Sequence, residues 1–122
     1  MRVSLIEQEI DAHALEIDAC ELHAQAVAEP EPAHGSAYLR GLWHYARGSA
    51  FVVQGNFAKA EEELKALKAA SVDPSVKELL TVANPAPTVL ELSALGLQGE
   101  MLSAQGRHDE AVKAFEAAVT LQ

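Results

Sequence analysis

Five polar side chains recur at helical spacing in the first part of the chain, and their types could do chemistry. They step by 4, 3, 4 and 3 residues and are Glu9, His13, Glu16, Cys20 and His23. On a helix these steps form one continuous stripe, which apolar residues flank on both sides. Imidazole, thiolate and carboxylate groups ligate Zn²⁺, so His13, Glu16, Cys20 and His23 are candidate metal ligands. One straight helix seldom offers four ligands to a single ion, so at least one ligand would come from elsewhere.

Three interpretations of this stripe remain open from the sequence. It could line the open groove of a helical stack while both apolar flanks pack on neighbouring helices. It could be a solvated stripe on a helix that packs loosely or dimerises. It could also be a buried functional cluster that holds a metal ion or a small molecule.

A second polar line follows further along the chain. Arg40, His44 and Arg47 step by 4 and 3 residues and share one face of an expected helix. They could pair with Glu9 and Glu16 across a hairpin, or receive an acidic peptide or another carboxylate. The plain alternative is a pair of arginines on an exposed helical face.

Signals for catalysis are few. Cys20 has His23 three residues on, but a thiolate–imidazole pair also needs an oxyanion hole and a shaped pocket. A glycine-rich phosphate loop, a paired CxxC and an HExxH are all missing from the sequence. We therefore expect a protein that is not an enzyme and that has no cofactor.

Proline and glycine divide the chain into the elements that must position these side chains. Prolines in residues 29–32 and 84–87 break helices, and Gly55 and Gly106 end them. Ser36, Asn56 and Asp73 are expected N-caps. The expected helices cover residues 4–28, 36–54, 57–70, 74–83, 87–105 and 108–121.

Two of these helix pairs repeat one pattern. Gly48-x-x-Phe51-x-x-x-Gly55-x-Phe57-x-x-Ala60-x-x-x-Leu64 returns as Gly99-x-x-Leu102-x-x-x-Gly106-x-His108-x-x-Ala111-x-x-x-Phe115. Small residues stand where two helices meet closely, and glycine closes the first helix of each pair. This is the pattern of a helix–turn–helix hairpin used twice, as in an α-solenoid.

The repeated hairpins resemble tetratricopeptide repeats. That family has a small residue in its first helix, an aromatic three residues on, a turn glycine and alanines in its second helix. The usual period is about 34 residues, whereas Gly55 and Gly106 are 51 residues apart. The stretches 29–32, 43–48, 84–86 and 99–100 resemble an interior portion of longer uncharacterised bacterial tetratricopeptide proteins. That likeness implies that the extra short helix is a family feature and that the chain is a short relative or a fragment.

These observations predict an all-α, tetratricopeptide-like α-solenoid of about six helices in one domain. Its parts would be an acidic helix and proline linker at 1–33, a first repeat at 36–70, a short inserted helix at 73–84, and a second repeat at 87–122. The fifth expected helix has apolar residues on two opposite sides. One side has Val89, Leu92, Leu95 and Leu102, and the other has Leu90, Leu97 and Met101.

Composition and charge limit the possible partners. The 122 residues carry a formal net charge of −9, and residues 1–32 hold eight of the 18 acidic residues and one of the 9 basic ones. Such a front end should repel nucleic acid and anionic lipid. No apolar run is long enough for a membrane span, and the start meets Glu7 too early for a secretory signal. The lone Cys20 favours a reducing compartment, so we expect a cytoplasmic protein.

The predicted function is a non-catalytic scaffold that presents a polar groove to a peptide or protein partner. The groove residues would be Glu9, His13, Glu16, His23, Arg40, His44 and Arg47. One alternative is a metal-binding or small-molecule module on the first stripe. Another is a structural homo-oligomer, since two repeats rarely suffice for stability and apolar surface should stay exposed at the carboxyl end. Self-association was assigned to Leu90, Leu97 and Met101.

Overall fold

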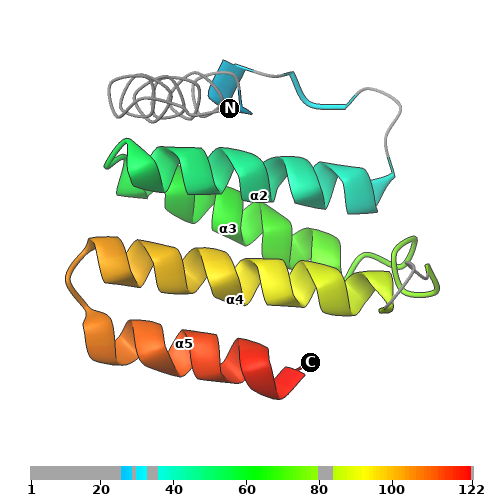
Figure 1. The fold of residues 1–122 in the computed structure, drawn as a ribbon. Coiled ribbons are helices and arrows are strands. Elements are labelled where there is room, and N and C mark those ends of the chain that lie inside the picture. The colour runs from blue at the N-terminus through cyan, green and yellow to red at the C-terminus, as the bar shows by residue number, and fades with distance from the viewer. Residues whose placement is uncertain (1–25, 29, 33–35, 80–83, 122) are drawn as a thin grey trace, which may run out of the picture.

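The computed structural model of the chain describes residues 26–28, 30–32, 36–79 and 84–121. Four helices follow one another in this part: α2 (Ala37–Val53), α3 (Phe57–Ser71), α4 (Ala86–Ala104) and α5 (His108–Leu121). They lie side by side, with short turns between α2 and α3 and between α4 and α5 (Figure 1). The all-helical expectation is confirmed for the described residues, and these four helices match their expected bounds within two residues. The helix expected at 4–28 lies almost entirely outside the described residues.

Both hairpin turns have the same backbone geometry. Gly55 and Gly106 adopt positive φ angles of 76° and 78°. In the first turn, the Asn56 N–H donates to the carbonyl of Phe51 at 2.8 Å and the Gly55 N–H to that of Val52 at 3.0 Å. In the second, the corresponding bonds start from residues 107 and 106 and measure 2.9 and 3.0 Å. This is the Schellman arrangement, in which glycine ends a helix in the left-handed region.

Replacing Gly55 or Gly106 by alanine is therefore expected to lower the free energy of unfolding by about 1–2 kcal/mol, because a Cβ crowds the backbone in this conformation. Gly96 is a matched control inside α4, since a Cβ there would meet no atom of the described residues within 4 Å. Gly96→Ala should raise stability by about 1 kcal/mol, because alanine is the better helix former. Urea denaturation measures all three variants, and equal effects at the three positions would contradict the turn geometry.

Two of the expected N-caps are present. The Ser36 hydroxyl accepts a hydrogen bond from the Leu39 N–H at 3.3 Å, and the Asn56 side chain accepts one from the Lys59 N–H at 3.3 Å. Each side chain satisfies an amide that has no partner within its own helix. Helix α4 has no side-chain cap and begins directly after Pro85.

The short helix expected within 73–84 is wrong for residues 73–79, which form turns; residues 80–83 lie outside the described part. The Val76 N–H donates to Asp73 and the Leu79 N–H to Val76, each at 3.0 Å, so the bonds span three residues. The Asp73 carboxylate accepts from the Ser75 amide at 2.8 Å and from its hydroxyl at 2.6 Å. These bonds lower the pKa of Asp73. A local side-chain bond of this kind competes with helical bonding, and Val76 is fully buried as an anchor for the turn.

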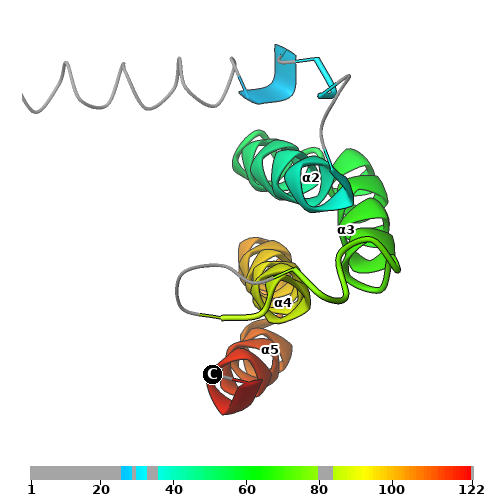
Figure 2. The same ribbon diagram turned by 90° about the vertical axis from the view of Figure 1, so that its right-hand side faces the viewer.

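Helix α4 joins the two hairpins. It packs against α2, α3 and α5, and the end-on view shows it between α2 and α5 (Figure 2). Glycines on α2 let the backbones approach: a Cβ at Gly41 would lie 2.8 Å from a methyl of Leu90, and one at Gly48 would lie 2.6 Å from Cδ2 of Leu97. The main core therefore contains leucines of α4 seated against glycines of α2.

This packing overturns the self-association expected at Leu90, Leu97 and Met101. Leu90 and Leu97 are 0% exposed and Met101 is 6% exposed, within the core that their own chain forms. The apolar side of α4 that suggested an intermolecular contact is covered by α2 and α3. A smaller cluster of Leu102, Ala111 and Ala114 holds α5 against α4.

Candidate functional site

The structure places some of the predicted groove residues and not others. Glu9, His13, Glu16, Cys20 and His23 lie outside the described residues, so their stripe remains a prediction. Arg40, His44 and Arg47 lie on α2 with half-buried side chains. The spacing argument correctly put them on one helix.

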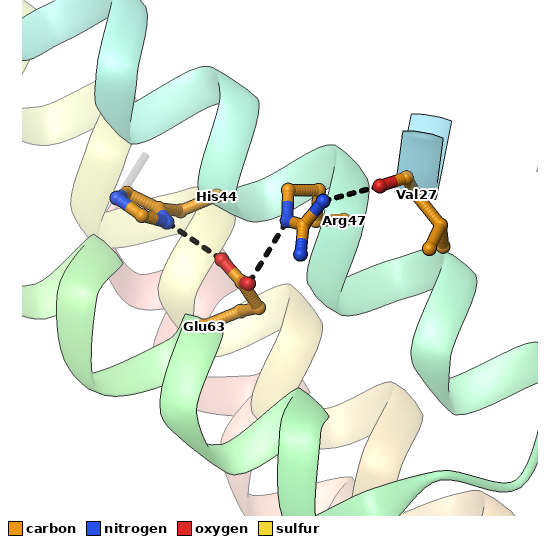
Figure 3. Close-up of polar contacts among 4 residues, drawn as sticks. All are labelled: Val27, His44, Arg47 and Glu63. Atoms are coloured by element: carbon orange, nitrogen blue, oxygen red, sulfur yellow. Dashed lines mark hydrogen bonds and ion pairs between the residues drawn. The ribbon is translucent and has the colours of Figure 1, made fainter. Parts of the chain in front are cut away.

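His44 and Arg47 share a carboxylate from the neighbouring helix (Figure 3). Nδ1 of His44 lies 2.6 Å from Oε2 of Glu63, and Nε of Arg47 lies 3.0 Å from Oε1. The three side chains are only 12–21% exposed. A carboxylate only accepts, so the Nδ1 proton of His44 lies on this bond. Each oxygen of Glu63 thus binds one basic side chain of α2, and the pair of bonds ties α2 to α3.

The guanidinium of Arg47 has further partners. Its NH1 group donates to the backbone carbonyl of Val27, as Figure 3 shows. The same group lies 4.7 Å from the ring centre of Trp43 and 5.3 Å from that of Phe51. Charge, hydrogen bonds and ring faces therefore all hold Arg47 within the fold. We conclude that His44 and Arg47 connect elements of the chain and do not form an open acceptor surface.

Sequence reasoning missed Glu63 as the partner. Glu61, Glu62 and Glu63 are consecutive, and nothing in their order says which of them faces α2. The remaining basic residue, Arg40, lines a shallow hollow of about 170 Å³ between α2 and α3 with His44 and Asp73. After the Ser75 hydrogen bonds, the Arg40 charge is a smaller cause of the lowered pKa of Asp73.

A second polar link joins α2 to α4. The Ser49 hydroxyl donates to the Glu100 carboxylate at 2.9 Å. Burial raises the pKa of the Tyr45 phenol, and the negative charge of Glu100 and a hydrogen bond to it raise that pKa further. Tyr45 and Ser49 thus bind one carboxylate of the second hairpin, which aligns the two hairpins along their length.

The largest hollow of the described surface is a trough between α3 and α5, with α4 as its floor. Its main part has a volume of about 740 Å³. The apolar floor includes Leu64, Leu95, Met101 and Leu102, and the charged rim is Glu61, Lys68, Arg107, Glu110 and Lys113. Arg107 binds Glu110 within this rim.

A second hollow of about 410 Å³ continues the trough toward the other end of α4. It shares Lys68 and Leu95 with the main part, and adds Ala94, Ala117 and Leu121. We call the two together the α3–α5 trough. Its signal in the sequence was the second apolar side of the helix that became α4, since Leu95 and Leu102 belong to that side.

Metal and membrane signals were searched over the same part of the chain. Across residues 26–28, 30–32, 36–79 and 84–121, no group of three or more His, Cys, Asp or Glu side chains comes together as a metal site. Of the helices that the structure describes, none combines the length and apolar character that a membrane crossing requires.

Comparison with known proteins gives no relative. No family model matches the chain, and neither a curated protein nor a solved structure matches it. The class that the structure defines is an all-helical protein whose two hairpins share a core through α4.

Proposed function

We propose that this protein is a non-catalytic, tetratricopeptide-like scaffold that binds a peptide or protein segment in the α3–α5 trough. The observation that carries the proposal is the trough itself, an open hollow of about 740 Å³ with an apolar floor and a charged rim. The repeated motif and the two matching glycine turns support the scaffold class.

The chemistry of the trough suits an amphipathic segment. Leu95, Met101 and Leu102 offer apolar contact along α4, and the hollow continues past Lys68 toward Ala117. An elongated apolar floor accepts residues repeated at helical spacing, as in other helix-in-groove complexes. The rim carries both signs of charge, with Glu61 and Lys68 on α3 and Lys113 on α5. Paired charges of this kind set the orientation of a bound segment and its specificity more than its affinity.

This site differs from the groove that spacing predicted. His44 and Arg47 already bind Glu63, so an acidic ligand would have to displace a half-buried carboxylate. Breaking such hydrogen bonds to charged groups costs about 1.5–3 kcal/mol each. The trough offers apolar surface to a ligand without that cost.

A bulky residue in the trough should block the ligand. Ala58 is exposed and lines the main hollow, so Ala58→Trp should fill part of it without disturbing the core. Ala104 is also exposed, lies at the end of α4 and lines no hollow of the described surface, so Ala104→Trp is the matched control. The probe is a peptide selected from a phage-displayed library on the unaltered protein. Fluorescence anisotropy should show at least about tenfold weaker binding to Ala58→Trp, which corresponds to about 1.4 kcal/mol.

The control should bind the selected peptide within about twofold of the unaltered protein. A photoreactive residue at Gln98, on the trough wall, should also crosslink to the peptide. Equal affinity for the two tryptophan variants, or a selection that enriches no peptide, would refute the proposal.

A further inference from the structure

Helix α5 has an uncovered apolar face. Val112, Phe115 and Val119 are 52%, 41% and 69% exposed, and their steps of 3 and 4 residues put them on one side of the helix. We call these three residues the α5 stripe. Apolar surface at this end of the chain was expected, but its residues differ from those that the sequence suggested.

The first hairpin shows what normally covers this position. In the repeated motif, Leu64 of α3 corresponds to Phe115 of α5. Leu64 is 2% exposed and belongs to the core that α4 completes, whereas Phe115 lies open. The α3 residues that correspond to Val112 and Val119 are Glu61 and Lys68, which are exposed and charged. Helix α5 thus has valines where its counterpart has charged groups facing water, and it lacks the covering helix.

The space beside the second glycine is already filled. In the first hairpin, Leu97 of the following helix sits against Gly48. In the second, the ring of Phe115 takes the equivalent place, because a Cβ at Gly99 would lie 2.5 Å from that ring. A leucine from a further helix would find no hole to enter. What remains is a low apolar ridge, and a ridge of this shape suits another helix that packs flat along it.

We propose that the occupant of the α5 stripe is the α5 helix of a second copy, packed antiparallel across a twofold axis. Such an isologous contact requires one patch to complement itself. The stripe meets that condition: with the axis near Phe115, Val112 of one copy faces Val119 of the other and the two phenylalanines meet. The 7-residue separation of the two valines equals that of Leu90 and Leu97, the pair that α4 inserts against α2.

The size and charge of the contact make the dimer weak and sensitive to salt. Helix α5 has 14 residues, so it is about 21 Å long. A contact of that length falls at the small end of specific interfaces, which indicates a dissociation constant of about 10–100 µM. Two Glu116 side chains flank the paired stripes, and each chain carries a net charge of −9. Higher salt should therefore strengthen association, because it screens this repulsion.

The α3–α5 trough and the α5 stripe use different residues of α5. Arg107, Glu110, Lys113 and Ala114 line the main trough, and none of them belongs to the stripe. The dimer would therefore leave two troughs open, and a partner with two binding segments would gain avidity from it.

Sedimentation velocity of the full chain tests the dimer between about 10 and 500 µM, around the expected dissociation constant. The unaltered protein should show a reversible monomer–dimer equilibrium, and Val112→Glu/Val119→Glu should weaken it at least about tenfold. Val72→Glu is the control, since Val72 is 75% exposed and lies in the turn after α3. Ala58→Trp should also dimerise normally, so failure of the dimer and failure of the trough are distinguishable. A monomer at every concentration, or equal loss in Val72→Glu, overturns the proposal.

Cysteine crosslinking tests the orientation in a Cys20→Ser background. Oxidation should link Phe115→Cys to itself, because its two copies meet near the twofold axis. Val112→Cys alone should stay unlinked, but it should link to Val119→Cys when the two variants are mixed. Self-linkage of Val112→Cys, or capture of a different protein in place of the second copy, would contradict the antiparallel dimer. Raising the salt from about 0.05 to 0.5 M should tighten the unaltered dimer several-fold, and Glu116→Gln should reduce this dependence.

Discussion

Replacing Leu97 by alanine is expected to lower the free energy of unfolding by about 2–5 kcal/mol, the largest effect of any substitution considered for this chain. Leu97 is fully buried and touches Gly48 on α2, at the contact that joins the two hairpins. Its removal leaves a cavity between helices whose backbones are already close, so neighbouring groups have little room to collapse into it. Urea denaturation followed by circular dichroism measures the loss.

Leu39→Ala is the matched control, since Leu39 is 51% exposed on α2. It should change stability by less than about 1 kcal/mol. A similar loss at both positions would contradict the assignment of Leu97 to the core.

A double-mutant cycle adds a test of the contact itself. Gly48→Ala alone should destabilise by about 1–3 kcal/mol, because the new Cβ would lie 2.6 Å from Cδ2 of Leu97. In the Leu97→Ala background that methyl is gone, so the same substitution should cost little or even stabilise α2. The coupling should be favourable by about 1–2 kcal/mol. Strictly additive effects would show that the two residues do not touch.

Glu63→Ala is expected to lower the free energy of unfolding by about 1.5–3 kcal/mol, which is typical for the loss of hydrogen bonds to charged groups. Glu63 is 12% exposed on its side chain and binds both His44 and Arg47, so its removal leaves two basic groups half-buried without their acceptor. Thermal and urea unfolding at neutral pH measure the loss.

The adjacent Glu62 offers a control of the same residue type. It is exposed, so Glu62→Ala should stay within about 0.5 kcal/mol of the unaltered protein. Glu63→Gln should fall between the two, because the amide keeps one acceptor oxygen and loses the charge. Equal stability of Glu62→Ala and Glu63→Ala would rule out the link between α2 and α3.

Local signals predicted most of the helical elements. Ser36 and Asn56 cap their helices, and Gly55 and Gly106 adopt the left-handed conformation that other residues avoid, because these effects depend on neighbours within a few positions. Residues 73–79 were the exception. There the Asp73 side chain bonds Ser75 and Val76 enters the core, and the resulting turn competes with a helix that the proline at 74 also favours.

The candidate site was harder to predict, for a physical reason. Helical spacing correctly put Arg40, His44 and Arg47 on one face, but it could not choose among three consecutive glutamates as their partner. That choice depends on how α3 rotates against α2, which packing around Gly48 and Leu97 decides.

The chain alone determined where helices begin and end, which side chains share a face, and that two hairpins use the same turn. Tertiary structure decided which apolar side of α4 is buried, that α3 and α5 leave a trough above it, and that the open apolar face lies on α5. The reason is that helix periodicity acts within one element, whereas burial depends on which elements cover one another. For α4, whose two sides are both apolar, only contact with α2 and α3 distinguishes core from surface.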